Sequence, residues 1–205
     1  MRQESDGKSV GYLRLTQFNG NAAIEVAKEV RNLESQGAEA YVLDLRNNPG
    51  GLLQSGIEIA RFWLEEGPIV YTVNRQGIQD SFEATGSVLT QAPLVVLVNQ
   101  GTASASEILA GALQDRGRAK LVGERTFGKG LIQSLFELSD GSGLAVTVAR
   151  YETPNHRDIN KAGIMPDVVV VSSPGSREQI ATVDDQQYQA AIDLLIHHSV
   201  LAGAA

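Results

Sequence analysis

Residues 101–107 read GTASASE and place a serine where an apolar run gives way to a helix-like pattern. Ser104 followed three residues later by Glu107 matches a helix capping box, and capping is the favoured interpretation of these residues taken alone. A serine at a helix start also suits a nucleophile, because the N–H groups of the first turn stabilise negative charge that develops beside it. The segment allows a cap or a catalytic serine, and Ser106 is the rival serine.

Residues 123–130 read GERTFGKG and nearly match the phosphate-binding pattern G-x-x-x-x-G-K-[ST]. Gly130 stands where the pattern needs a hydroxyl for magnesium, and residues 131–138 read as a strand rather than the required helix, so both features disfavour nucleotide binding. Lys129 could instead act as a catalytic base. Burial between glycines and apolar residues would favour its neutral form and make it a general base, whereas the alternative is an exposed loop lysine.

Residues 46–51 read RNNPGG, a composition typical of a turn. Paired glycines between a strand and a helix can also bring backbone N–H groups close to a ligand, as an oxyanion hole requires. Pro49 has no N–H, so Gly50 and Gly51 are the candidate donors.

The three histidines do not favour a Ser-His-Asp triad. His156 lies in a polar turn, and His197 and His198 lie on an expected terminal helix; none is beside a glycine-rich loop. Lysine is the recognised alternative base for a catalytic serine.

The elements that must position these loops alternate between strand and helix. Such alternation favours an α/β fold with a parallel sheet. Expected strands cover residues 11–15, 40–45, 69–73, 94–98, 120–122, 131–138 and 144–151, and a chain segment at 163–171 returns to the sheet edge; residues 74–92 are expected to hold a hairpin. Expected helices cover residues 23–33, 57–64, 104–113 and 184–201.

The composition of the chain argues against several classes of function. The chain has 205 residues, enough for one domain, and a net charge of −7, which argues against nucleic-acid binding. It has no cysteine, so thiolate catalysis and Cys-ligated zinc are excluded, and no histidine spacing indicates a metal. Neither a signal peptide nor a membrane-spanning segment is expected.

Together, the three motifs resemble those of the carboxy-terminal processing proteases, also called tail-specific proteases. Residues 44–51 (DLRNNPGG), 101–107 and 123–130 match in type, order and spacing, and the similarity continues through residues 147–167. Within the family, residues 149–154 (ARYETP) and 158–161 (DINK) are most similar to cyanobacterial and chloroplast members. Those members mature a photosystem II reaction-centre subunit precursor.

The resemblance implies a ClpP/crotonase-like α/β core of mixed sheet with packed helices, without the PDZ domain usual in the family. It implies a serine endopeptidase that cleaves near the C-terminus of protein substrates through an acyl-enzyme and uses no cofactor or metal. The catalytic dyad falls on Ser104 and Lys129, and Gln133 helps to orient the lysine. The backbone N–H groups of Ala105 and Gly51 form the oxyanion hole. Asp115 is interpreted as structural.

The expected organisation is a single catalytic domain over residues 1–205. Residues 1–10 are interpreted as the remnant of a linker from a PDZ domain, and residues 180–205 as a terminal helix. The expected partners are protein or peptide substrates, bound through their C-terminal tails, and the family implies an extracytoplasmic location in periplasm or thylakoid lumen. A nucleotide-binding enzyme using residues 123–129 and a catalytically silent interaction module are the alternatives.

Overall fold

The computed structural model describes residues 2–3, 9–172 and 175–202, with side chains from 9 to 196 apart from 173–174. Its main sheet has six strands in the order β1-β2-β3-β6-β7-β10. The bounds are β1 Arg2–Gln3, β2 Ser9–Arg14, β3 Ala40–Asp44, β6 Leu94–Val98, β7 Lys120–Gly123 and β10 Val168–Val169. All neighbouring pairs are parallel except β1 and β2, so the predicted α/β core with a mixed sheet is confirmed.

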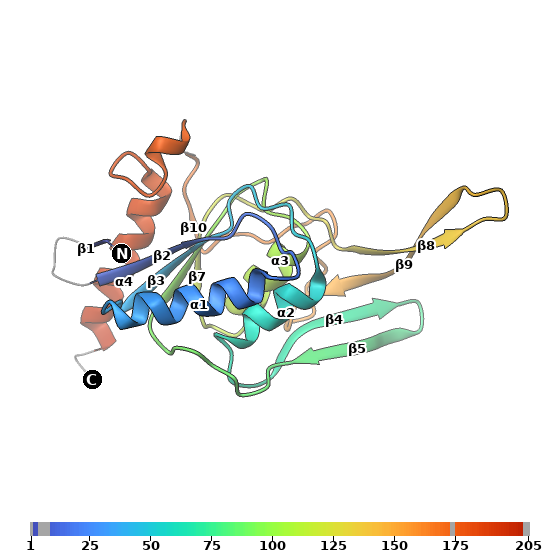
Figure 1. Ribbon diagram of the computed structural model, residues 1–205, viewed down its shortest axis with the longest axis horizontal. Coiled ribbons are helices and arrows are strands. Elements are labelled where there is room, and N and C mark those ends of the chain that lie inside the picture. Colours follow the sequence, from blue (N-terminus) through green and yellow to red (C-terminus); the bar gives the residue numbers. More distant parts are fainter. Residues whose placement is uncertain (1, 4–8, 173–174, 203–205) are drawn as a thin grey trace.

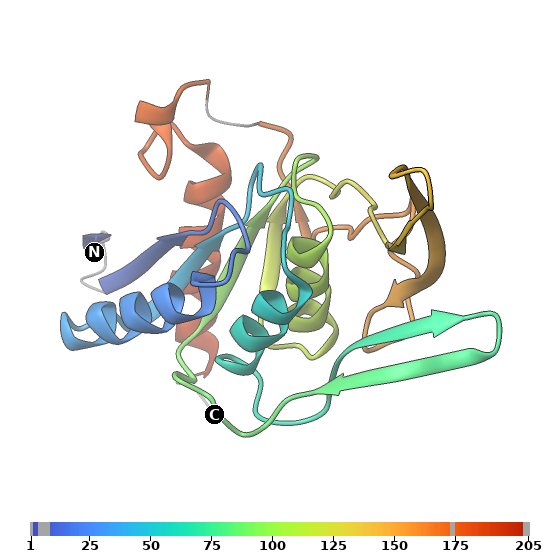
Figure 2. The same ribbon diagram turned by 45° about the vertical axis from the view of Figure 1, so that its right-hand side comes forward.

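Helices cover both faces of this sheet (Figures 1 and 2). Helices α1 (Ala22–Ser35), α2 (Leu53–Arg61) and α3 (Ala105–Asp115) lie on one face, and α4 (Gln186–Ala202) lies on the other. Strands β3 and β6 are buried at every position because both of their faces are covered. In the part of the chain that the structure describes, no helix combines the length and apolarity needed to span a bilayer.

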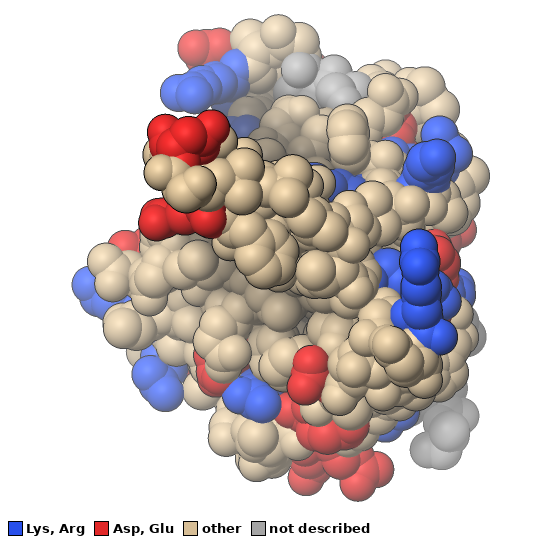
Figure 3. Space-filling view, turned by 90° about the vertical axis from the view of Figure 1, so that its right-hand side faces the viewer, with Lys and Arg blue, Asp and Glu red and all other residues tan. Residues whose placement is uncertain are grey.

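A second, antiparallel sheet projects from the side of this core (Figure 1). Its order is β5-β4-β9-β8, with bounds β4 Pro68–Asn74, β5 Gly77–Glu83, β8 Leu131–Glu137 and β9 Gly143–Glu152. The hairpin expected within residues 74–92 is placed differently, because β5 pairs with the preceding strand β4 and only β5 lies within that range. On the face with the two hairpins, charged side chains lie mostly toward the outline, and the centre is largely uncharged (Figure 3).

Several element boundaries differ from the sequence prediction. The terminal helix begins at Gln186 rather than near residue 180, because a 3-10 turn, η1 (Arg177–Gln179), precedes it and the Asp185 carboxylate accepts the N–H of Tyr188 at 3.1 Å as a helix cap. Ser9 and Val10, assigned to the linker remnant, belong to β2, which pairs with β3. Residues 62–64 follow the end of α2.

All three chemistry-bearing loops leave the main sheet at the same edge. Residues 45–51 follow β3, residues 99–104 follow β6 and residues 124–130 follow β7. Because β3, β6 and β7 are mutually parallel, their carboxyl ends meet at one edge, which is where open α/β sheets place their ligand sites.

A buried ion cluster joins this edge to α4. The Arg46 guanidinium donates to both oxygens of Asp44, at 2.9 and 2.7 Å, and to both oxygens of Asp185, each at 2.8 Å. Asp44, Arg46 and Asp185 are at most 3% exposed. Burial alone would raise the pKa of Asp185, but hydrogen bonds from Arg46 and from the N–H of Ala181 outweigh it and hold that pKa below its usual value.

The cluster predicts a pH-dependent loss of stability in Asp185→Asn. Removing one charge from a buried pair should lower the free energy of unfolding by about 3 kcal/mol at pH 7. Because the folded-state pKa of Asp185 is depressed, its contribution is complete above the unfolded value of about 3.9 and disappears as pH falls through the lower folded value. Urea unfolding at pH 7 and at successively lower pH measures the free energy of unfolding of the parent protein and of Asp185→Asn. The difference between the two should disappear below about pH 4. Exposed Asp184→Asn is the matched control, and an equal effect of both substitutions would contradict the cluster's role.

Candidate active site

Ser104 lies in the tight turn between β6 and α3, with φ 57° and ψ −118°. A serine rarely adopts a positive φ, and holding it there costs on the order of 1–3 kcal/mol. The side chain is half-buried and therefore accessible. A strained strand-to-helix turn that presents a serine at the sheet edge is a geometry suited to a nucleophile.

The buried carboxylate of Glu107 joins this turn to the lysine loop. One oxygen, Oε2, accepts the backbone N–H of Ser104 at 2.9 Å and that of Lys129 at 2.8 Å. The other, Oε1, accepts the hydroxyl of Thr126 at 2.5 Å and the N–H of Gly128 at 2.7 Å. The serine turn and the lysine loop are therefore held together by one side chain that is 0% exposed.

Because Ser104 and Lys129 bond the same oxygen atom, their backbones are neighbours. Among the described contacts, no hydrogen bond joins the Ser104 hydroxyl to the Lys129 amine, so the proximity concerns the two backbones. The lysine loop is fixed from other sides as well: the N–H of Phe127 donates to the carbonyl of Thr102 at 3.0 Å, and the carbonyl of Gly128 accepts the N–H of Lys161 at 2.8 Å.

The structure decides between the two interpretations of the Lys129 side chain that the sequence left open. Lys129 is exposed rather than buried between its apolar neighbours, because residues 124–130 form a surface loop at the root of the β8–β9 hairpin. Gln133 is also exposed, on β8, and no hydrogen bond joins its side chain to Lys129 among the described contacts. Sequence proximity therefore does not by itself bring Gln133 to the lysine.

The turn after β3 packs directly against the nucleophile turn, and only glycine fits there. Gly50 has φ 95°, and a Cβ atom on it would lie 2.6 Å from the carbonyl oxygen of Ala103 and 2.8 Å from Cβ of Ser104. Gly51 has φ 142°, and its Cβ would lie 2.1 Å from the carbonyl oxygen of Phe18. Both glycines are thus required by close backbone approach.

The hydrogen bonds of this turn separate the two candidate oxyanion donors. The N–H of Gly50 donates to the side chain of Asn48 at 2.9 Å and is buried, so it is already used. Among the hydrogen bonds of residues 9–172, none uses the N–H of Gly51 or of Ala105. Ala105 is the first residue of α3, where backbone N–H groups have no partner within the helix.

Ser106, the rival serine, is 0% exposed and donates its hydroxyl to the carbonyl of Asn48 at 3.0 Å. It ties α3 to the glycine turn and does not face solvent. Asp115, at the far end of α3, pairs with Arg157 and accepts the N–H of Asn155 at 2.9 Å. These contacts are structural.

The remaining sequence candidates lie elsewhere. His156 stacks on Tyr71, with ring centroids 4.5 Å apart, and its Nδ1 lies 3.2 Å from Glu152. The side chains of His197 and His198 lie outside those that the structure describes. Among the described residues, no group of three or more His, Asp or Glu side chains could hold a metal ion.

Sequence reasoning did not identify three residues that organise this site. Glu107 was interpreted only as a helix cap, Thr126 received no role, and Asp185 lies far away in the sequence. The capping-box pattern was a signal for Glu107, since it placed a carboxylate beside Ser104. No local pattern signals a bond between Arg46 and a residue 139 positions later.

Comparison with known proteins identifies the family of this chain. The model of peptidase family S41 matches residues 9–170. A carboxyl-terminal-processing protease of Picosynechococcus sp. is 66% identical over 199 residues, which are 97% of this chain and 48% of that protein. A protease of the same name from Synechocystis sp. is 70% identical over 189 residues, covering 92% of this chain and 44% of the relative.

A solved structure is similar as well. The photosystem II D1 C-terminal processing protease superposes with a TM-score of 0.81 and 48% identity, covering 87% of this chain and 47% of that one. The chain thus spans about half the length of the relatives it matches. From Ser9 to Val170, which includes the strained serine turn, the lysine loop and the glycine turn, the chain belongs to peptidase family S41.

Proposed function

We propose that the chain is the catalytic domain of a serine endopeptidase, with Ser104 as nucleophile and Lys129 as general base. The observation that supports this most directly is the bonding of both backbones to one oxygen of Glu107. The high identity to carboxyl-terminal-processing proteases supports the same reaction class.

In the proposed reaction, the neutral amine of Lys129 takes the proton from the Ser104 hydroxyl, and the oxygen attacks a peptide carbonyl. The N–H groups of Ala105 and Gly51 stabilise the resulting oxyanion; each such donor lowers the barrier by about 3 kcal/mol. The lysine then gives its proton to the leaving amine, which departs as the new N-terminus. Water hydrolyses the acyl-enzyme by the same steps in turn.

Because Lys129 is exposed, the proposed reaction relies on the bound substrate to shield its amine from water. A peptide lying over the loop would exclude water from the amine and disfavour its charged form. The proposal assigns Gln133 to orient the amine in that complex, where β8 and the lysine loop are covered together.

The proposed substrates are proteins or peptides cleaved near their C-termini. Leu52, Phe127 and Leu131 stand beside the site in the chain and are 54%, 65% and 40% exposed, which supports contact with apolar residues of a peptide. The proposed location is extracytoplasmic, in periplasm or thylakoid lumen; several relatives are named as chloroplastic.

Substitution of the two serines should separate nucleophile from scaffold. Ser104→Ala should abolish peptide cleavage and leave the fold intact. Ser106→Ala should keep measurable turnover and lower the free energy of unfolding by about 1 kcal/mol, since it removes only a hydroxyl bond to Asn48. Peptide cleavage and urea unfolding of the purified variants measure both effects. Retained cleavage in Ser104→Ala, or selective loss in Ser106→Ala, would rule out the assignment.

Substitution of Lys129 tests whether the amine acts as a base or only as a charge. Lys129→Arg keeps a positive charge but cannot accept a proton near neutral pH, so it should be as inactive as Lys129→Ala. In the parent enzyme the cleavage rate should rise with pH as the amine of Lys129 loses its proton, and neither variant should gain activity at high pH. Exposed Lys28→Ala on α1 serves as control. Substantial turnover by Lys129→Arg would show that the residue acts electrostatically and not as a base.

The Glu107 contact predicts a positioning effect on the rate. Glu107→Gln cannot accept all four bonds, because its amide nitrogen faces two donors that the carboxylate oxygen accepted. Displacement of Ser104 from Lys129 by about 1 Å would lower kcat on the order of 100-fold. Exposed Glu65→Gln is the matched control. Unchanged kcat in a folded Glu107→Gln protein would contradict the positioning role.

The alternative functions have weaker support. In the nucleotide interpretation, the N–H groups of Gly128 and Lys129 would bind phosphate, but both already donate to Glu107, and a strand, β8, follows the loop. Saturable ATP binding with magnesium would revive that interpretation. A silent interaction module would not react with serine-directed acylating reagents, whereas the protease should be labelled at Ser104.

A further inference from the structure

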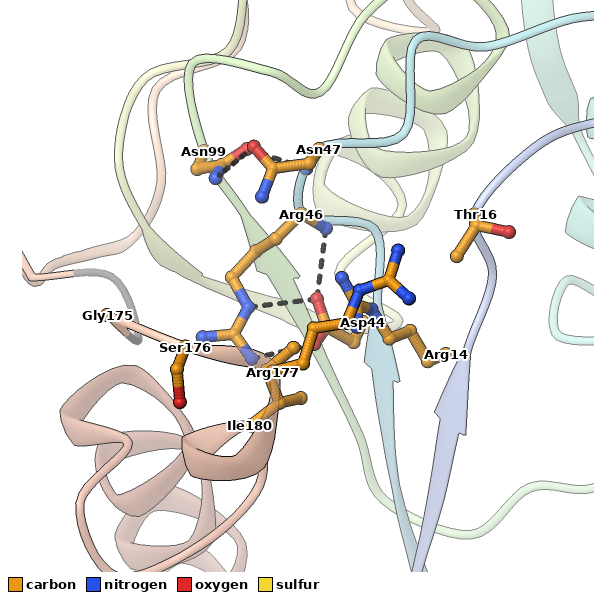
Figure 4. A pocket seen from close by; sticks show the side chains of 10 residues that line it. All are labelled: Arg14, Thr16, Asp44, Arg46, Asn47, Asn99, Gly175, Ser176, Arg177 and Ile180. Atoms are coloured by element: carbon orange, nitrogen blue, oxygen red, sulfur yellow. Dashed lines mark hydrogen bonds and ion pairs between the residues drawn. The ribbon is translucent and has the colours of Figure 1, made fainter.

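A cavity lies at the same sheet edge as the proposed dyad, and half of its lining residues are arginines and asparagines. It has a volume of about 450 Å³, and its walls include Arg14, Arg46 and Arg177 together with Asn47 and Asn99 (Figure 4). In a chain with a net charge of −7, three arginines around one cavity are an unusual concentration of positive charge.

The only acidic wall residue, Asp44, is already neutralised. Its carboxylate accepts three bonds from Arg46 and one from the hydroxyl of Tyr12 at 2.6 Å. Burial and then the Asp44 carboxylate raise the pKa of Tyr12, so this hydroxyl stays protonated and donates. Arg46 is in turn fully occupied by Asp44, Asp185 and the side-chain oxygen of Gln187.

Arg14 and Arg177 supply the uncompensated charge. Arg14 is the last residue of β2 and lies beside Asp44 in the parallel register, and Arg177 begins η1. Both extend into the space beside Asp44 (Figure 4). Among the described residues, no carboxylate lies within ion-pair distance of either guanidinium. Two such forks facing one cavity match the geometry of a planar anion such as a carboxylate.

Two wall residues of the cavity belong to the turns that form the proposed active site. Asn47 begins the glycine turn that leads to Gly51, and Asn99 begins the turn that leads to Ser104. The two amides bond each other at 3.0 Å, and the Asn99 side-chain oxygen also accepts the N–H of Gly101. The glycine turn and the serine turn thus each contribute one residue to the wall of this cavity.

We propose that this cavity is a subsite for a carboxylate of the bound peptide, held between Arg14 and Arg177. This inference rests on the proposed peptidase function. The carboxylate is either the terminal one of the substrate tail or an acidic side chain near it, and both have the same chemistry. The amides of Asn47 and Asn99 line the same cavity and supply its neutral polar wall.

Binding of labelled peptides to the Ser104→Ala variant tests the subsite without requiring turnover. One pair of peptides differs only in a free C-terminal carboxylate or a C-terminal amide. A second pair, both amidated, differs only in a Glu or a Gln next to the C-terminus. In at least one pair, fluorescence anisotropy should show about tenfold tighter binding of the carboxylate peptide, and the pair that responds identifies the source.

The arginine variants decide whether this preference comes from the cavity. The double substitution Arg14→Gln and Arg177→Gln should abolish the preference, and each single substitution should reduce it; both side chains are exposed without an ion-pair partner, so the fold should be kept. Exposed Arg31→Gln on α1, which removes the same charge, should leave the preference unchanged. Equal binding within both pairs, or a preference that survives the double substitution, would overturn the proposal.

The two proposals fail separately. Carboxylate-dependent binding in a protein that cleaves no peptide would contradict the peptidase proposal and keep the subsite. Peptide cleavage with no preference for a carboxylate, in KM or in binding, would support the peptidase proposal and contradict the subsite.

Discussion

The geometry of the proposed active site depends on one buried carboxylate. Glu107 accepts four hydrogen bonds, from the serine turn on one side and from the lysine loop on the other. A buried carboxylate is tolerated only when its oxygens are fully bonded, so each of the four donors is needed for the others to stay in place. Removing any donor would leave a costly charge in the core. The backbones of Ser104 and Lys129, the proposed dyad, are therefore neighbours because both donate to Glu107.

A second buried charge cluster supports the other side of the site. Arg46 immediately precedes the glycine turn and is held between Asp44 on β3 and Asp185 before α4. The helix on the far face of the sheet is thereby connected to the turn that carries the proposed oxyanion donor. Hydrophobic packing alone could not fix that turn, because its atoms are mostly polar backbone. Hydrogen bonds of Asn48 and Asn99 hold the turn itself, and Arg46 holds the residues just before it.

Much of the fold could be predicted from the sequence, because buried parallel strands and amphipathic helices leave clear patterns. The run at 94–98 and the helix at 22–35 are examples, and the three loops at the sheet edge follow from the parallel order of the strands. The exposure of Lys129 could not be predicted, since burial depends on where the β8–β9 hairpin projects. The Arg46–Asp185 bond could not be predicted either, because its partners are 139 residues apart and no local periodicity encodes them.

The positive φ of Ser104 strains the backbone and lowers the stability of the fold. Glycine would adopt that backbone conformation without strain, and the surrounding contacts involve the backbone of residue 104 rather than its hydroxyl. Selection for folding alone would thus favour a glycine there. The strain at Ser104 is thus a cost to folding that no described hydrogen bond of its hydroxyl offsets.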